Sequence, residues 1–208
     1  MRVLVIGATG RVGADAVRLA VEAGHEVTAF VRDPAKLRSG VNVRAVVGDV
    51  SRPETVDAAI AAGVDAVLNA AGVDPLKPST FVTDTARVLV GAMQRAGVRR
   101  YTAVSGVANM PRKSLMGKMS TAIMKLTPVR HAIRDHMGAF EIVRSSGLDW
   151  SLAGCPWIKD PGVTGVYRES DTYPGGQLTI RTGDVAHFLV KTLKHPEYLQ
   201  RIVCIWNA

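Results

Sequence analysis

Gly7-Ala8-Thr9-Gly10-Arg11-Val12-Gly13 is the stretch of sequence that decides the fold. It follows an apolar run at Arg2–Ile6 that predicts a strand, and it opens residues 11–23, whose apolar side chains recur at helical spacing. At such a junction the first glycine allows a tight turn, the second lets a diphosphate approach the backbone, and the third lets the helix pack on the sheet. The amides at the helix start then bind the anion. The alternative is a turn of the same shape that holds no ligand.

From this turn we predict that the pyrophosphate of a dinucleotide cofactor is bound by Gly7, Thr9, Gly10, Arg11, Val12 and Gly13.

The rest of the chain continues the alternation of strands and helices. Strands are expected at Glu26–Val31, Val43–Val47, Asp65–Asn69, Arg100–Val104, Asp149–Ala153 and Ile202–Trp206. Helices are expected after Asp33-Pro34 and at Pro53–Ala62, 79–96, Val129–Ser145 and Val185–Leu193, the last with Asp184 as its N-cap. This order predicts an α/β fold of the Rossmann type, a doubly wound parallel sheet with right-handed crossovers. We expect a single domain over 1–208, with a small C-terminal region on the substrate side, mainly 106–180.

The composition excludes several classes of protein. An apolar share of 47% with 21% charged residues is that of a globular chain. No apolar run reaches the roughly 18 residues of a membrane helix, and the first residues read as a strand and not as a signal peptide. The two cysteines, Cys155 and Cys204, lack metal-ligand spacing and are expected to be buried thiols in a reducing compartment. We therefore expect a cytoplasmic protein with no metal and no membrane contact.

The net charge of +8 raises the question of a nucleic-acid partner. The basic excess lies at 112–134, where no recognised nucleic-acid motif and no interleaving of aromatic and basic residues is found. Attraction of a polyanionic cofactor, or solubility, explains the charge more simply. We expect no nucleic-acid partner.

The end of the second strand indicates which dinucleotide is bound. A site for NAD places an acidic side chain there, about 20 residues after the glycine turn, on the ribose 2′-hydroxyl. Here the position is taken by Arg32, and Lys36 follows one helical turn later. A guanidinium suits a 2′-phosphate, so we expect NADP(H). The alternative is that Arg32 is only solvated and that Asp33 caps the helix at Pro34.

Two more strand ends complete the predicted cofactor groove, since ligands of open α/β sheets lie beyond the carboxyl ends of the strands. The third strand ends in Gly48-Asp49-Val50, where Asp49 and Val50 are expected at the adenine. The fourth ends in Asn69-Ala70-Ala71-Gly72, where the small residues Ala70, Ala71 and Gly72 are expected to let a ribose lie against backbone.

Together these motifs resemble the atypical short-chain dehydrogenase/reductases, in the NmrA-like NAD(P)H-binding group and nearest the biliverdin-IXβ reductase (flavin reductase) subgroup. The resemblance continues through Val143–Trp150, Thr164–Tyr167 and Thr182–Phe188, and so covers nearly the whole chain. It implies hydride transfer from NADPH to a flat, conjugated acceptor, with Ser105 near the nicotinamide. Asp135-His136 matches an Asp-His pair of that subgroup.

The chain departs from the subgroup on the substrate side. Where the subgroup has a histidine after the sixth strand, the sequence Cys155-Pro156-Trp157-Ile158 has Trp157. The segment Val73-Asp74-Pro75 differs as well. Both differences put reduction of biliverdin itself in question.

The chain has no Tyr-x-x-x-Lys pair, the usual proton shuttle of short-chain dehydrogenases. A flavin-like acceptor needs no such pair, because its proton can come from water. Our catalytic candidates are Ser105, as a hydrogen-bond donor or as a mere turn cap, and His136, as a proton donor or as a surface residue. Candidate substrate contacts are Met110, Pro156 and Trp157, with core packing as the alternative for Trp157. The Met-rich basic stretch 110–126 fits a substrate lid, core packing or an oligomer contact.

Three functions remain open on the sequence. The first is an NADPH-dependent reductase of a flavin, quinone or other conjugated small molecule. The second is a non-catalytic NADP(H) sensor of the NmrA type, and the third is an atypical epimerase, dehydratase or ketoreductase. The resemblance favours a monomer, while the helix at 79–96 leaves a dimer open.

Overall fold

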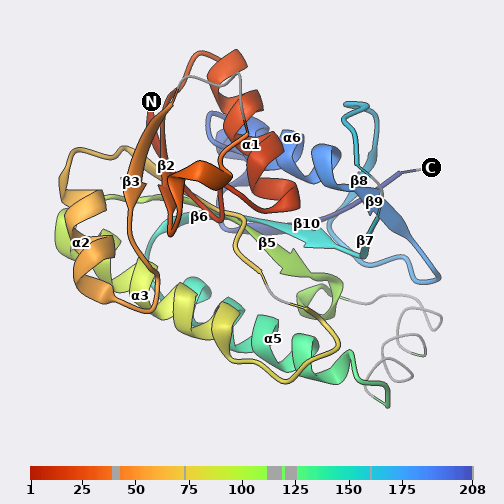
Figure 1. The fold of residues 1–208 in the computed structure, drawn as a ribbon. Helices are drawn as coiled ribbons and strands as arrows, with labels where there is room; N and C mark the ends of the chain where they lie inside the picture. The colour runs from red at the N-terminus through yellow and green to blue at the C-terminus, as the bar shows by residue number, and fades with distance from the viewer. Residues whose placement is uncertain (39–42, 73, 112–118, 120–125, 160, 208) are drawn as a thin grey trace.

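A computed structural model describes residues 1–38, 43–72, 74–111, 119, 126–159 and 161–207. In these residues the main sheet has eight strands in the order β3-β2-β1-β4-β5-β6-β10-β8 (Figure 1). Its parallel strands are β1 (Arg2–Ile6), β2 (Glu26–Val31), β3 (Arg44–Val47), β4 (Ala66–Asn69), β5 (Arg100–Gly106), β6 (Asp149–Cys155) and β10 (Arg201–Trp206). The edge strand β8 (Arg168–Ser170) runs antiparallel to β10.

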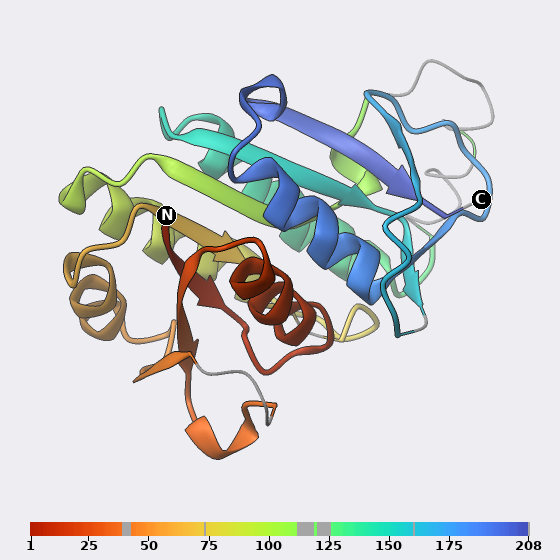
Figure 2. The ribbon, with the colours of Figure 1, turned by 90° about the horizontal axis from the view of Figure 1, so that it is seen from above.

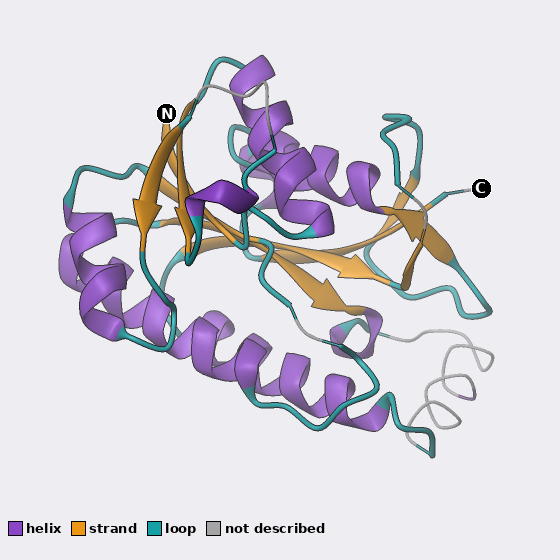
Figure 3. Ribbon diagram, in the orientation of Figure 1, coloured by secondary structure: helices purple, strands orange, loops and turns teal. Residues whose placement is uncertain are grey.

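The helices cover the sheet in two layers (Figures 2 and 3). One face carries α1 (Arg11–Glu22) and α6 (Thr182–Thr192). The opposite face carries α2 (Pro53–Ala61), α3 (Phe81–Ala96) and α5 (Arg130–Arg144). Short 3₁₀ turns lie at η1 (Pro34–Lys36), η2 (Val107–Asn109) and η3 (Pro196–Tyr198). The predicted doubly wound α/β sheet is confirmed.

The first strand shows why this sheet needs helices on both faces. Val3 and Val5 belong to the core beneath α1 and α6, while Leu4 and Ile6 belong to the core beneath α2 and α3. All four side chains are at most 1% exposed. A parallel strand buried on both sides reads as a continuous apolar run, which is the pattern that Arg2–Ile6 presents.

The carboxyl-terminal part holds more strand than the sequence indicated. Besides β8, a two-stranded parallel ribbon joins β7 (Trp157–Lys159) to β9 (Thr179–Arg181). These strands have three residues each, and periodicity gives no signal over so short a length. Most of the Met-rich stretch 110–126 lies outside the described residues.

The prediction that Asp184 is the N-cap of the last helix is wrong. The helix starts at Thr182 with Arg181 as its N-cap, so Asp184 lies inside the first turn. Its carboxylate is fully buried and accepts hydrogen bonds from Thr164, Gly165 and Asn207. An acidic residue in a first turn also suits the helix dipole, so the sequence pattern does not separate the two positions.

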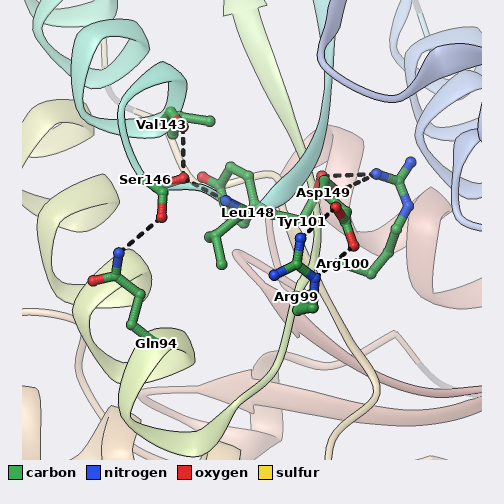
Figure 4. Close-up of polar contacts among 8 residues, drawn as sticks. All are labelled: Gln94, Arg99, Arg100, Tyr101, Val143, Ser146, Leu148 and Asp149. Atoms are coloured by element: carbon green, nitrogen blue, oxygen red, sulfur yellow. Dashed lines mark hydrogen bonds and ion pairs between the residues drawn. The ribbon is translucent and has the colours of Figure 1, made fainter.

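Polar contacts close the amino-terminal edge of β5 and β6, opposite the glycine turn (Figure 4). Arg99 binds the Asp149 carboxylate at 2.9 and 3.0 Å, and Gln94 Nε2 donates to the carbonyl of Ser146 at 2.9 Å. The buried Arg100 guanidinium donates to Ser151 Oγ and to main-chain carbonyls, and burial lowers its pKa to about 10. The polar side chains at this edge bind one another and the main chain. The carboxyl edge is the one where the sequence predicts a ligand.

Candidate cofactor and active site

The glycine turn has the geometry that its sequence predicts. Gly7 has a φ of +77°, and a Cβ there would lie 2.7 Å from the amide nitrogen of Ala71. At Gly13 a Cβ would lie 2.0 Å from the carbonyl oxygen of Gly7. Both positions therefore exclude any side chain, because the turn, the helix and the β4 turn meet as backbone on backbone.

Gly10 has a different role from its two neighbours. A Cβ at Gly10 would have Gly7 O at 3.2 Å as its nearest contact, and the residue is exposed. Gly10 is also the N-cap of α1, with no side-chain cap, and the first amide to bond back into the helix is that of Ala14. The preceding amides point out of the helix start, with the positive end of the helix dipole behind them. The diphosphate of NAD(P)H fits this cradle.

At the end of β2, Arg32 and Lys36 are both exposed. Asp33 does cap η1, since its carboxylate accepts from the Ala35 amide at 3.0 Å, and it lies 3.9 Å from the Lys36 ammonium. The cap proposed for Asp33 is thus confirmed. The Arg32 side chain is exposed, and its charge acts on Asp49 at the end of the next strand. Its contact with a 2′-phosphate stays a prediction.

Asp49, at the end of β3, carries an ionised carboxylate. The amide of Ser51 donates to it at 2.9 Å, as does the Ser51 hydroxyl, and these bonds hold the pKa of Asp49 below its usual range. The positive charges of Arg32 and Arg52 act in the same direction. A carboxylate of this kind is an acceptor for an amino group such as that of adenine, and Val50 follows it half-buried.

The β4 turn is held by a side chain that the sequence reasoning treated only as part of a motif. Asn69 donates to the hydroxyl of Tyr101 at 3.0 Å and accepts from the amide of Ala71 at 3.1 Å. Ala70 and Ala71 are half-buried against the glycine turn, and the space around Gly72 is open. Asn69 thus fixes the wall on which a ribose is predicted to lie.

Ser105 and His136 are brought together from β5 and α5. Both line a small cavity of about 10 Å³, room for about one water molecule, which Asn69 and Tyr101 also line. Ser105 is 4% exposed, His136 is half-buried, and burial lowers the pKa of His136 against the opposing charge of Asp135. The imidazole is therefore neutral at pH 7.

Sequence reasoning missed Asn109, which joins these two residues. Its Nδ2 donates to Ser105 Oγ at 3.0 Å and to the main-chain carbonyl of His136 at 2.9 Å. Asn109 lies in the 3₁₀ turn η2, directly after β5. An Asn four residues beyond a strand-end Ser is a weak signal in sequence, since only the turn brings the two together.

Tyr101 lines the same cavity and is almost completely buried. Burial raises its pKa to about 12, although the hydrogen bond from Asn69 acts in the opposite direction. The expected absence of a tyrosine–lysine shuttle is thus consistent with the surroundings of this tyrosine.

The three predicted substrate contacts lie in different surroundings. Met110 is 2% exposed and packs with Tyr173 and Cys204 in the core, so a ligand reaches it only if this packing opens. Pro156 is half-buried. Trp157 is 46% exposed on β7, so core packing does not account for its side chain.

The predictions of no membrane contact and no metal can be compared with the described residues. No described helix combines the length and the apolar character that a membrane crossing requires. Among the described His, Cys, Asp and Glu side chains, no three are grouped as metal ligands, and Cys155 and Cys204 are free, buried thiols.

Residues 7–196 match the family model described as NAD(P)H-binding. Among named relatives, the NAD(P)H azoreductase of Xenophilus azovorans is 38% identical over 52% of this chain and 37% of that protein. The photosystem II assembly factor Ycf39 of Guillardia theta is 33% identical over 100% of this chain and 67% of that protein. The chain spans between about a quarter and two thirds of the length of the curated relatives it matches.

Solved structures agree on the fold. ChuY of Escherichia coli O157:H7, named an anaerobillin reductase, superposes with a TM-score of 0.79 at 20% identity, covering 100% of this chain and 97% of that one. A short-chain dehydrogenase/reductase of Veillonella parvula in complex with NADP has a TM-score of 0.77 at 14% identity, covering 99% and 94%. The Rossmann-type fold and the resemblance to NAD(P)H-binding oxidoreductases are confirmed.

Proposed function

This chain belongs to the NAD(P)H-binding family, and we propose on that premise that it is an NADPH-dependent reductase of a flat, conjugated small molecule such as a flavin, a quinone or a linear tetrapyrrole. The observation that carries the proposal is the cavity between β5 and α5. It is lined by a hydrogen-bonding serine, Ser105, a neutral imidazole, His136, and Asn69, which holds the β4 turn. Tyr101, which also lines the cavity, has its pKa raised to about 12 by burial, and its hydroxyl accepts a hydrogen bond from Asn69.

A site of this kind suits an acceptor that needs orientation more than acid catalysis. When bound, NADPH supplies a hydride to the acceptor, and a proton from water completes the two-electron reduction. The α1 amides hold the diphosphate, and Arg32 pairs with the 2′-phosphate. Ser105 donates to a carbonyl of the nicotinamide or of the acceptor, and His136 presents a neutral ring nitrogen that exchanges protons with water.

Reductases among the compared proteins support this function. One relative is named an NAD(P)H azoreductase and one structural neighbour an anaerobillin reductase, while another relative is named a probable pinoresinol-lariciresinol reductase. None of these names selects the acceptor of the present chain.

A second candidate rests on a separate observation. Ycf39, whose match extends over the whole of this chain, is named a photosystem II assembly factor. A chain of this kind would bind NADP(H) and present a surface to a partner protein according to the redox state of the nucleotide.

One experiment separates the two candidates. Purified protein is mixed with NADPH and, in turn, FMN, riboflavin or a simple quinone, and absorbance is followed at 340 nm, with NADH as the paired control. Acceptor-dependent loss of NADPH, much slower with NADH and weaker in Ser105→Ala, supports the reductase. NADPH binding by calorimetry with no turnover of any acceptor overturns the reductase and favours the sensor.

A further inference from the structure

The ribbon of β7 and β9 gathers an aromatic ring and two cations on one side. Its parallel register pairs Trp157 with Thr179 and Lys159 with Arg181. Paired residues of neighbouring strands point to the same face, and residues two apart in a strand share that face. Trp157, Lys159, Thr179 and Arg181 therefore lie on one face of the ribbon.

Burial confirms this division of the ribbon. Between the two pairs lie Ile158 and Ile180, and Ile180 is 1% exposed in the core beneath α6, with Ile158 packed against that core. On the other face Trp157, Lys159 and Arg181 are all exposed. In the described part of the chain neither Lys159 nor Arg181 belongs to an ion pair, so both charges face solvent.

Hydrogen bonds attach the ribbon to the residue that follows β10. Asn207, just beyond β10, accepts from the amide of Arg181 at 2.8 Å and donates its own amide to the carbonyl of Thr179 at 2.9 Å. The Asn207 side chain also donates to the buried carboxylate of Asp184 at 2.8 Å. The partners of this carboxylate are Thr164, Gly165 and Asn207, and among the described residues it forms no ion pair with Arg181.

The ribbon lies at the ligand edge of the sheet (Figure 1). It follows β6 directly, and the last residue of β6, Cys155, pairs with Gly106, the neighbour of Ser105. Trp157 is two residues further along the chain. The exposed ring therefore stands on the side of Ser105 away from the dinucleotide turn of β1 and α1, since β5 lies between β4 and β6 in the sheet.

We propose that this face binds the anionic part of the acceptor, and that the physiological acceptor is a planar conjugated molecule carrying a phosphate or a carboxylate. Trp157 offers a surface for stacking, and Lys159 and Arg181 offer charge to the anionic group. This inference rests on the proposed reductase function and narrows its substrate class. The proposal also assigns a function to two of the positive charges of this basic chain, those of Lys159 and Arg181.

The test compares FMN with riboflavin, which share one ring system and differ only in a phosphate. Binding is measured by quenching of flavin fluorescence, with the dinucleotide site saturated by NADP⁺ so that the glycine turn cannot hold the phosphate of FMN. We expect FMN to bind about tenfold more tightly than riboflavin, as two partly exposed ion pairs allow, and the preference to shrink in 0.5 M salt.

Variants then locate the effect. Lys159→Ala/Arg181→Ala removes the preference for FMN and leaves the riboflavin affinity unchanged, while Trp157→Ala weakens both flavins equally. The charge-matched control Arg95→Ala/Arg144→Ala, at exposed positions on α3 and α5, leaves both affinities unchanged. Equal affinities of the wild type for the two flavins, or an unchanged preference in the double variant, overturn the proposal. Phosphate-dependent binding without any oxidation of NADPH overturns the reductase function and leaves the anion site standing.

Discussion

The side-chain amide of Asn109 donates a hydrogen bond to Ser105 Oγ at 3.0 Å while its second hydrogen is donated to the carbonyl of His136 at 2.9 Å. A main-chain carbonyl only accepts, so the contact with His136 fixes which way the amide faces. Ser105 must then accept at Oγ, and its own hydroxyl hydrogen is directed elsewhere. We therefore predict that Asn109 is a positioning residue, which leaves the Ser105 hydroxyl hydrogen for the ligand of the proposed reductase.

Replacing Asn109 by Asp tests this arrangement. At neutral pH the carboxylate accepts the Ser105 hydroxyl hydrogen and repels the His136 carbonyl. We therefore expect kcat to fall by about 100- to 1,000-fold, the range for a lost hydrogen-bond donor at a reacting oxygen. A protonated carboxyl can donate again, so the activity of Asn109→Asp should recover as the pH falls. The pH–rate profile of the variant checks this.

Asn109→Ala is the control for that profile, since it removes the positioning without adding a titrating group. It should lose activity at all pH values and show no recovery in acid. If the Asp and Ala variants have parallel profiles, Asn109 supports only the packing of η2.

Substitution of two motif glycines, Gly13 and Gly10, should have two different effects. Gly13→Ala places a Cβ 2.0 Å from Gly7 O and should destabilise the fold by about 3 kcal/mol or more, as overpacking against rigid backbone does. Gly10→Ala meets only one atom at 3.2 Å and should fold normally, yet bind NADPH at least tenfold more weakly. Thermal unfolding and calorimetric titration measure the two effects; equal stability of the two variants would refute the distinction.

Arg32 should determine the preference for NADPH. Loss of one charge-assisted hydrogen-bonding partner is worth about 1.5–3 kcal/mol, so Arg32→Ala should weaken NADPH binding by about 10- to 100-fold and leave NADH binding within about twofold. Arg44→Ala, an exposed arginine on β3, serves as the control and should change neither. A parallel loss for both nucleotides would mean that Arg32 does not contact the 2′-phosphate.

His25 should make the fold sensitive to mild acid. Its ring is buried, its Nδ1 has no hydrogen-bond partner among the described residues, and burial lowers its pKa, helped by the charges of Lys194 and the N-terminus. The unfolded chain therefore protonates His25 more readily than the folded chain does. Above about pH 6.5 His25 does not reduce the free energy of unfolding. As the pH falls from there toward the lowered pKa of the folded state, the free energy of unfolding decreases.

Urea unfolding at pH 7.5, 6.5 and 5.5 measures this decline. His25→Asn should flatten the pH dependence, whereas His195→Asn, which removes an exposed histidine paired with Glu197, should leave it as in the wild type. An unchanged slope in His25→Asn would assign the effect to other groups, such as His136.

The sequence predicts those parts of the molecule that depend on local pattern. The motif at Gly7–Gly13 predicts its own geometry because Gly7 and Gly13 have no room for a side chain, and the long alternation of strands and helices predicts the sheet. The sequence did not predict the hydrogen bonds of Asp184 and Asn109. Those of Asp184 depend on partners distant in sequence, and those of Asn109 depend on one turn of backbone. The ribbon of β7 and β9 was not predicted for the same reason, since Lys159 and Arg181 become neighbours only through strand pairing.

The proposed activity of this chain is hydride transfer from NADPH to a conjugated acceptor, and an anaerobic single-turnover experiment follows this transfer itself. Enzyme in excess is mixed with NADPH and FMN, and the loss of NADPH at 340 nm is followed together with bleaching of the flavin at 450 nm. We predict that the two signals proceed together, one flavin for each NADPH, and that NADPH deuterated at the transferred position slows both. Tight binding of NADPH with no faster bleaching than in buffer would contradict the account.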